Sequence, residues 1–201
     1  MRRAIATTLR KLLGRSDHRH WMALANHSSK WDTRTALLAQ LVPANSTVIE
    51  FGAGRLILMD MLPAGCSYTP SDLVDRGHDT IVLDLNSKHL PALPRYNVAV
   101  LSGVIEYIND VPRLVKYLGT FSDSVLCSYA VLELNANQRR EQGWVNDHTS
   151  IQLVSLFTTQ GFDCRFAQRW KAQMLYGFEN KASNPPCRLS TTPAPSTKSC
   201  T

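Results

Sequence analysis

A glutamate followed by two closely spaced glycines forms the most distinctive chemical pattern of the sequence. Glu50 ends a run of apolar and β-branched residues, and Gly52, Ala53 and Gly54 follow after one phenylalanine. Glycines let the backbone turn tightly and approach a ligand closely, because they carry no Cβ. Glu50 can accept a hydrogen bond or pair with a cation at the carboxyl edge of a sheet, where open α/β sheets bind ligands. The run therefore predicts a ligand-binding turn, with a purely structural strand-to-helix turn as the alternative.

Two common nucleotide-binding loops do not fit this turn. The dinucleotide-binding fingerprint has a third glycine at the position that Ile57 occupies here. A P-loop requires Gly-Lys followed by Ser or Thr, which the sequence lacks at this place. A nicotinamide-dependent oxidoreductase is thus an alternative that Ile57 disfavours.

Alternating strand-like and helix-like segments must position this turn. Apolar runs and periodicity predict strands over 46–51, 67–69, 80–83, 96–101, 124–129, 162–170 and 174–178, and helices over 21–41, 56–62, 111–118 and 149–160. Pro70 limits the second strand to an edge or to a short element. The alternation predicts an α/β fold, a doubly wound and mostly parallel sheet with a C-terminal antiparallel strand pair.

The run from Val48 to Gly54 resembles motif I of the class I methyltransferases that depend on S-adenosylmethionine (SAM), and the resemblance extends over approximately residues 31–178. It implies a Rossmann-like methyltransferase sheet with SAM as the cofactor. In that family an acid after the second strand holds the ribose hydroxyls, and Asp72 stands twenty positions beyond Gly52. An acid after the third strand lies near the adenine, and Asp84 matches it.

The fourth strand of many family members runs into a turn of small residues, which Ser102 and Gly103 match. The resemblance implies that the cofactor is bound by Glu50, Gly52, Ala53, Gly54, Asp72, Leu73, Asp84, Leu85, Ser102 and Gly103. The sequence departs from the family at Leu56, where motif I commonly has a third glycine. Asp75 is the alternative to Asp72, since Pro70 affects the register there.

Methyl transfer from a sulfonium needs alignment and exclusion of water more than a fixed set of catalytic residues. A hydroxyl acceptor would also need a general base. The candidates near the expected carboxyl edge are Glu106, Tyr107, Tyr129, Glu133 and His148. For each, a structural role such as helix capping or lining the cofactor pocket is the alternative.

The polar segment 134–148 is a predicted lid. Within it Trp144 faces either a substrate or the core, and Arg139 and Arg140 either attract an anionic acceptor or occupy an exposed helix face. The stretch 98–108 looks like methyltransferase-domain proteins of small-molecule or polysaccharide pathways. We therefore expect a methyltransferase acting on a small-molecule or glycan-precursor acceptor; the alternative is a non-catalytic SAM-fold protein acting through a partner or a membrane surface.

The net charge of +6 belongs to the two ends of the chain. Residues 1–20 carry +5 and residues 181–201 carry +3, whereas the remainder holds 13 basic and 15 acidic side chains. A phosphate-binding groove across the folded body is therefore not expected, and neither is binding of nucleic acid there. The five cysteines include no C-x-x-C pair or zinc-ligand spacing, so we expect reduced thiols and no metal. No segment has the roughly 18 consecutive apolar residues of a membrane span, so a cytoplasmic protein is expected.

The first fifteen residues predict a short basic amphipathic helix. Ile5, Leu9, Leu12 and Leu13 recur at helical spacing among basic residues. Such a helix lies on an anionic membrane, serves as a targeting peptide, or docks loosely on the domain. We thus divide the chain into a basic segment (1–20), a methyltransferase domain (21–180) and a disordered tail (181–201), whose composition is poor in apolar residues.

Overall fold

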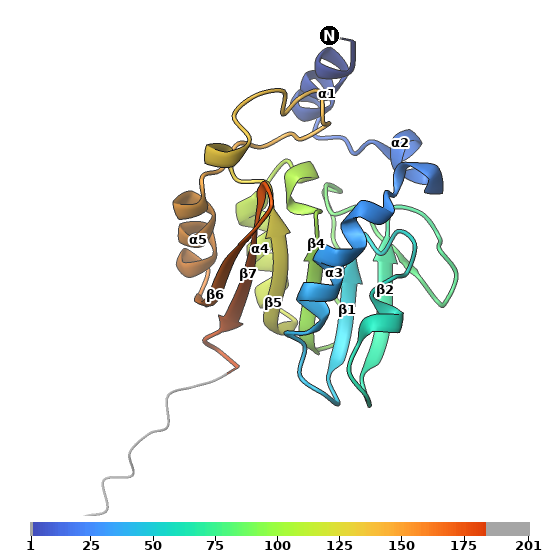
Figure 1. Cartoon of the computed structure of the whole chain (residues 1–201), viewed down its shortest axis with the longest axis vertical. Coiled ribbons are helices and arrows are strands. Elements are labelled where there is room, and N and C mark those ends of the chain that lie inside the picture. The colour runs from blue at the N-terminus through green and yellow to red at the C-terminus, as the bar shows by residue number, and fades with distance from the viewer. Residues whose placement is uncertain (1, 184–201) are drawn as a thin grey trace, which may run out of the picture.

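A seven-stranded sheet runs through the protein and carries helices on both faces (Figure 1). The computed structural model describes residues 2–183. The strand order is β3-β2-β1-β4-β5-β7-β6. Six of these strands run in one direction, and β7 runs opposite to them. The strands are β1 (Thr47–Phe51), β2 (Ser67–Asp72), β3 (Ile81–Val82), β4 (Tyr96–Ser102), β5 (Ser122–Tyr129), β6 (Phe162–Trp170) and β7 (Gln173–Asn180). The predicted mostly parallel sheet with a C-terminal antiparallel pair is confirmed.

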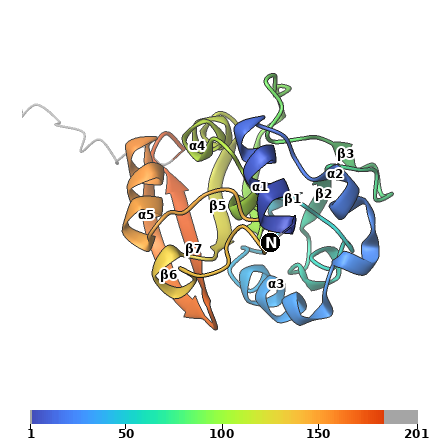
Figure 2. The same cartoon turned by 90° about the horizontal axis from the view of Figure 1, so that it is seen from above.

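Helices α4 and α5 cover one face of the sheet and α3 covers the other, as the view from above shows (Figure 2). The α-helices are α1 (Arg2–Leu12), α2 (His18–Met22), α3 (Asp32–Ala39), α4 (Val111–Gly119) and α5 (Ser150–Thr159). The side chain of Asp110 caps α4 by accepting from the Arg113 amide. Thr149 and Gln152 form a reciprocal capping box at α5.

Side chains of the central strands pack into two separate hydrophobic cores, one on each face of the sheet. Val98 and Val100 of β4 pack on the α3 side, whereas Ala99 and Leu101 pack on the α4 and α5 side. Successive side chains of a strand point to opposite faces, so a strand buried on both faces needs a continuous apolar run. This explains why β4 could be recognised from its composition.

Residues 56–62 do not form the predicted α-helix. Leu56 adopts a left-handed conformation with φ of 60°, and only the short 3-10 helix η3 (Met59–Met61) follows. After Leu56 only residues 57–62 remain before Pro63, fewer than two helical turns. The apolar residues still contribute to the core, since Leu58 is fully buried.

The predicted long helix over 21–41 is also wrong. The segment breaks into the end of α2, the 3-10 helices η1 (Leu24–Asn26) and η2 (Ser29–Trp31), and α3. Ser28 has an extended backbone, and its hydroxyl accepts from the Lys30 amide, which starts a new turn. Short polar side chains compete with the helix in this way.

Of the two alternatives that Pro70 predicted for the second strand, an edge strand or a short element, the six-residue β2 is not an edge strand along its whole length. It lies between β1 and β3, but β3 pairs only with Ser71 and Asp72. At Pro70, β2 therefore has a neighbouring strand on the β1 side only, where Pro70 pairs with Glu50. The edges of the sheet are the two-residue β3 and the long β6, which has an irregularity between Cys164 and Phe166.

Residues 2–20 pack on the domain at the carboxyl ends of the parallel strands, with α1 above them in Figure 1. In the part of the chain that the structure describes, no helix is long and apolar enough to cross a bilayer. The predicted disordered tail lies outside the described residues from residue 184 onward, and the division of the chain at residues 20 and 180 stays a prediction.

Leu153 of α5 is fully buried against the core, whereas Ile151, two residues earlier, is 82% exposed. Leu153→Ala should lower the free energy of unfolding by about 2–5 kcal/mol, because it removes buried methyl groups and leaves a cavity. Ile151→Ala is the control and should change it by less than about 0.5 kcal/mol. Urea unfolding measures both, and equal effects would contradict the assigned face of α5.

Candidate functional site

A cavity of about 260 Å³ opens at the carboxyl edge of the sheet, where the tips of β1, β2 and β4 meet the N-terminal segment. All ten residues predicted to bind the cofactor line it. They are Glu50, Gly52, Ala53, Gly54, Asp72, Leu73, Asp84, Leu85, Ser102 and Gly103. The topology brings them together because the carboxyl ends of parallel strands share one edge.

The turn after β1 has no room for a larger residue at its first glycine. Gly52 has φ of +71°, and a Cβ there would lie 2.6 Å from Cγ2 of Val104. The amides of Gly52 and Ala53 both donate to the Ser71 carbonyl, at 2.8 and 3.1 Å. The turn is thus fixed to β2 and packed against the segment after β4.

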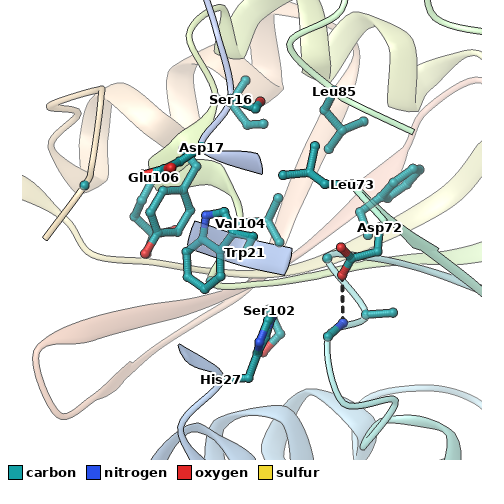
Figure 3. Close-up of a pocket in the computed structure, with 18 of the residues that line it drawn as sticks. Ser16, Asp17, Trp21, His27, Asp72, Leu73, Leu85, Ser102, Val104 and Glu106 are labelled. Carbon is teal, nitrogen blue, oxygen red and sulfur yellow. Dashed lines mark hydrogen bonds between the residues drawn. The ribbon is translucent and has the colours of Figure 1, made fainter. Parts of the chain in front are cut away.

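Asp72 links the same turn to the tip of β2. Its Oδ2 accepts from the Gly54 amide at 2.8 Å, the bond drawn in Figure 3. Its Oδ1 pairs with Arg76 at 3.2 Å, and both side chains are only 5% exposed. The rival acid, Asp75, does not line this cavity. Of the two candidate acids, Asp72 is therefore the one at the cavity, and its role toward the ribose stays a prediction.

Glu50 is buried, and the Tyr68 hydroxyl donates to its Oε2 at 2.5 Å. Burial raises the pKa of the Glu50 carboxyl to about 8, because the charged form loses its hydration. At neutral pH the group is therefore mostly protonated, and of the two predicted partners, a hydrogen-bond donor or a cation, the structure shows the donor, Tyr68.

Arg34 of α3 lines the cavity, and sequence reasoning missed it. Its guanidinium donates to the Ser102 hydroxyl (3.1 Å) and carbonyl (3.0 Å), and to Oε1 of Gln173 (3.1 Å). A Cβ on Gly103 would lie 2.5 Å from Nη1 of Arg34, so the glycine lets the cation cover the turn. Arg34 is only 5% exposed. An arginine in a polar helix reads as a solvated side chain, and no motif marked this one.

The N-terminal segment closes the cavity from the side opposite the sheet. The Ser16 hydroxyl donates to Oδ1 of Asp84 at 2.7 Å, and the His18 ring lies 3.2 Å from Oδ2. The backbone amide of Asn86 also donates to Oδ1 of Asp84, at 2.9 Å, as is typical of an aspartate that forms a turn.

Two aromatic side chains of this segment border the same cavity. Trp21 and His27 stand with Ser16 and Asp17 around it, opposite Asp72 and Leu73 (Figure 3). The Trp21 ring packs edge-on to Tyr107 at 4.9 Å and tilted to His27 at 5.3 Å. Sequence reasoning missed this lining because residues 21–41 were predicted to form one continuous helix, whereas the chain is broken there into short elements.

Two of the five candidate bases, Glu106 and Tyr107, line the cavity. Oε1 of Glu106 accepts from the Ala130 amide at 2.8 Å, whereas its buried Oε2 has no partner among residues 2–183. Burial raises the pKa of Glu106. The Tyr107 hydroxyl lies 3.3 Å from the indole nitrogen of Trp144, which also lines the cavity.

The other three candidates do not line the cavity. The Tyr129 hydroxyl donates to Asn146 and accepts from the His148 amide, and Glu133 accepts from the Ser150 amide. Of the two alternatives for Arg139, the exposed helix face is wrong, since the side chain is 4% exposed. Its guanidinium donates to the carbonyls of Asn146 and Ala130 and thereby holds the 134–148 segment in place.

The family described as "Methyltransferase domain" matches residues 18–169. The chain belongs to this family. The resemblance to the class I SAM-dependent methyltransferases is thereby confirmed at the level of the family. A search of curated proteins finds no match.

Solved methyltransferase structures share the fold of this methyltransferase at low sequence identity. CalO1, a methyltransferase in calicheamicin biosynthesis, is 15% identical with a TM-score of 0.59, over 77% of this chain and 55% of that chain. A putative O-methyltransferase from Nostoc punctiforme is 13% identical with a TM-score of 0.65, over 82% and 62%. A SAM-dependent methyltransferase from Mesorhizobium loti is 14% identical with a TM-score of 0.58, over 72% and 96%. This methyltransferase thus spans little more than half the length of CalO1.

The raised pKa of Glu50 makes the stability of this methyltransferase depend on pH. The carboxyl has an ordinary pKa of 4.5 when unfolded and about 8 when folded, so unfolding releases a proton between these values. The free energy of unfolding should therefore fall as pH rises from 4.5 to 8, by on the order of 1.4 kcal/mol for each unit of pKa difference.

Glu50→Gln removes this titration and should flatten that part of the profile relative to the wild type. Chemical denaturation at a series of pH values measures the difference between the two proteins. Parallel profiles would show that Glu50 titrates normally in the folded state.

Proposed function

We propose that this methyltransferase transfers a methyl group from SAM to a hydroxyl group of a small molecule or glycan precursor, with Glu106 as the general base. Two observations carry the proposal: Glu106 lines the cavity, and its buried Oε2 has no hydrogen-bond partner among residues 2–183. An alcohol is a poor nucleophile until its proton leaves, so a base at this place has a direct chemical use.

The residues present fit a polar nucleoside ligand. Buried atoms of three cavity-lining residues, Oγ of Ser71, Nδ1 of His27 and Oε2 of Glu106, lack partners among the described residues. Buried polar atoms are nearly always satisfied, so such a group of unpaired atoms favours a bound polar molecule. Because Gly52 and Gly103 carry no Cβ, Val104 and the Arg34 guanidinium pack directly against the turns that line the cavity.

Each part of the cofactor has a matching partner. We assign the turn from Gly52 to Gly54 and the Arg34 guanidinium to the methionine portion, whose carboxylate is an anion. Asp72 accepts from the ribose hydroxyls, and Asp84 with Leu85 borders the adenine. When bound, SAM supplies a methyl group on a positively charged sulfur, which needs no further activation.

The chain's own contribution is enclosure and proton removal. Trp21 and His27 from the N-terminal segment and Trp144 from the 134–148 segment cover the cavity and exclude water. Glu106 accepts the acceptor's proton with its free oxygen while the Ala130 amide fixes the other oxygen. Its raised pKa makes the group a stronger base than an exposed carboxylate.

Two observations support a small acceptor. The cavity lies beneath the N-terminal segment, where Trp21 and His27 line it, and a covered cavity favours a small molecule over a long polymer. CalO1 and the Nostoc punctiforme protein are named for natural-product biosynthesis and for O-methyl transfer, respectively.

Gly52→Ala should weaken SAM binding by roughly tenfold or more, because the new Cβ would meet Val104 and strain a left-handed backbone. Isothermal calorimetry with SAM and with S-adenosylhomocysteine measures the affinity. Gly161→Ala is the matched control: its φ is +90°, but nothing lies within 4 Å of the added Cβ and it does not line the cavity. Equal affinities of the Gly52 variant and the wild type would refute the assigned cofactor turn.

Glu106→Gln should leave SAM affinity within a few-fold and lower methyl transfer by about 10²–10⁴-fold, since the amide cannot accept the proton. Release of S-adenosylhomocysteine is measured with a panel of phenols, sugars and other alcohols. Glu133→Gln, whose carboxylate lies outside the cavity, is the control and should keep full activity. Undiminished turnover by the Glu106 variant would exclude it as the base, and SAM binding without turnover of any acceptor would favour the non-catalytic alternative.

A further inference from the structure

Helix α1 presents its apolar side to the solvent. Ile5 and Leu9 are 54% and 55% exposed, and Leu12 and Leu13 are 77% and 64% exposed. Residues three and four apart share one side of a helix, so these four side chains form a single stripe, here called the α1 stripe.

The polar side of α1 makes the contacts with the domain. Thr7 is fully buried, and because it stands two residues after Ile5 it lies on the opposite side of the helix. Arg3 donates to the Gln142 carbonyl at 3.4 Å, and Lys11 lies 3.9 Å from Asp147. Arg10 pairs with Asp17 at 2.9 Å. Polar contacts therefore hold α1 in place above the cavity.

This orientation is the reverse of that of an ordinary surface helix, whose apolar stripe faces the core. By contrast, α4 and α5 of the same protein bury their apolar residues against the sheet. The α1 stripe thus needs an apolar phase that residues 2–183 do not supply.

We propose that the α1 stripe inserts into the surface of an anionic membrane. Charge favours this partner, since residues 1–20 carry six basic side chains and one acid. Arg2, Arg15 and Arg19 are exposed, and the one acid, Asp17, is already paired with Arg10. An amphipathic helix with a basic polar side binds anionic lipid through both buried apolar area and electrostatic attraction.

The docked orientation places the cavity next to the bilayer. Arg10 and Arg15 belong to the same segment as the stripe and line the cavity. Resting on the proposed function, this geometry predicts an amphiphilic acceptor whose hydroxyl lies at the level of the lipid headgroups. Membrane binding itself is measured without any methyl transfer, so its outcome is separate from that of the enzyme assays.

Sedimentation of the full chain with phosphatidylcholine vesicles that contain phosphatidylglycerol tests the proposal. The wild type should pellet with these vesicles and not with pure phosphatidylcholine vesicles. Leu9→Gln and Leu12→Gln should each weaken binding roughly tenfold, because each leaves one apolar side chain less to bury. Arg2→Gln should weaken it less, and added salt should weaken wild-type binding further.

Two control variants lie away from α1, in segments that lead into the amino ends of β1 and β5. Leu41→Gln changes an apolar residue that is 37% exposed after α3, and Lys116→Gln removes an exposed charge from the last turn of α4. Both should bind vesicles like the wild type, and thermal unfolding checks that every variant is folded. Equal binding by the leucine variants, or none by the wild type, would overturn the proposal. A wild-type dimer in analytical ultracentrifugation that Leu12→Gln dissociates would assign the stripe to a second copy instead.

Discussion

The burial of ionisable side chains at the carboxyl edge of the sheet is the constraint on which this structure depends. Arg34, Glu50, Asp72 and Glu106 are each 5% exposed or less. A charge taken out of water is costly unless hydrogen bonds or a counter-charge replace its hydration. Arg34 is satisfied by the β4 turn and Gln173, and Asp72 by the Gly54 amide and Arg76. Several of the compensating hydrogen bonds come from the turns that line the cavity, at Gly54 and Ser102. The buried side chains therefore hold these turns in place, and the turns in turn make the burial of those side chains possible.

The strands and the cofactor turn could be predicted because each follows from local rules. Strand β4 is a continuous apolar run, and α4 begins at an aspartate with proline in its first turn. Strand ends that share an edge bring Gly52, Asp72 and Ser102 together without any knowledge of side-chain packing. These parts of the site are consequences of topology.

Other parts depend on long-range contacts that a local pattern does not contain. The apolar residues 56–62 favoured a helix, but the left-handed Leu56 and the approaching Pro63 prevented one. Arg34 is buried only because Ser102 and Gln173, from distant strands, meet it. Trp21 lines the cavity because the chain before α3 folds back over the sheet, which no periodicity indicates.

The two edges of the sheet govern how the molecule behaves at high concentration. An unpaired strand edge is a template for another chain, and proteins protect it with short strands, charges and bulges. Strand β3 is only two residues long, and β6 carries Arg165 and Arg169 together with the irregularity after Cys164. Both edge strands therefore disfavour pairing with a strand of a neighbouring molecule, and the sheet stays at seven strands.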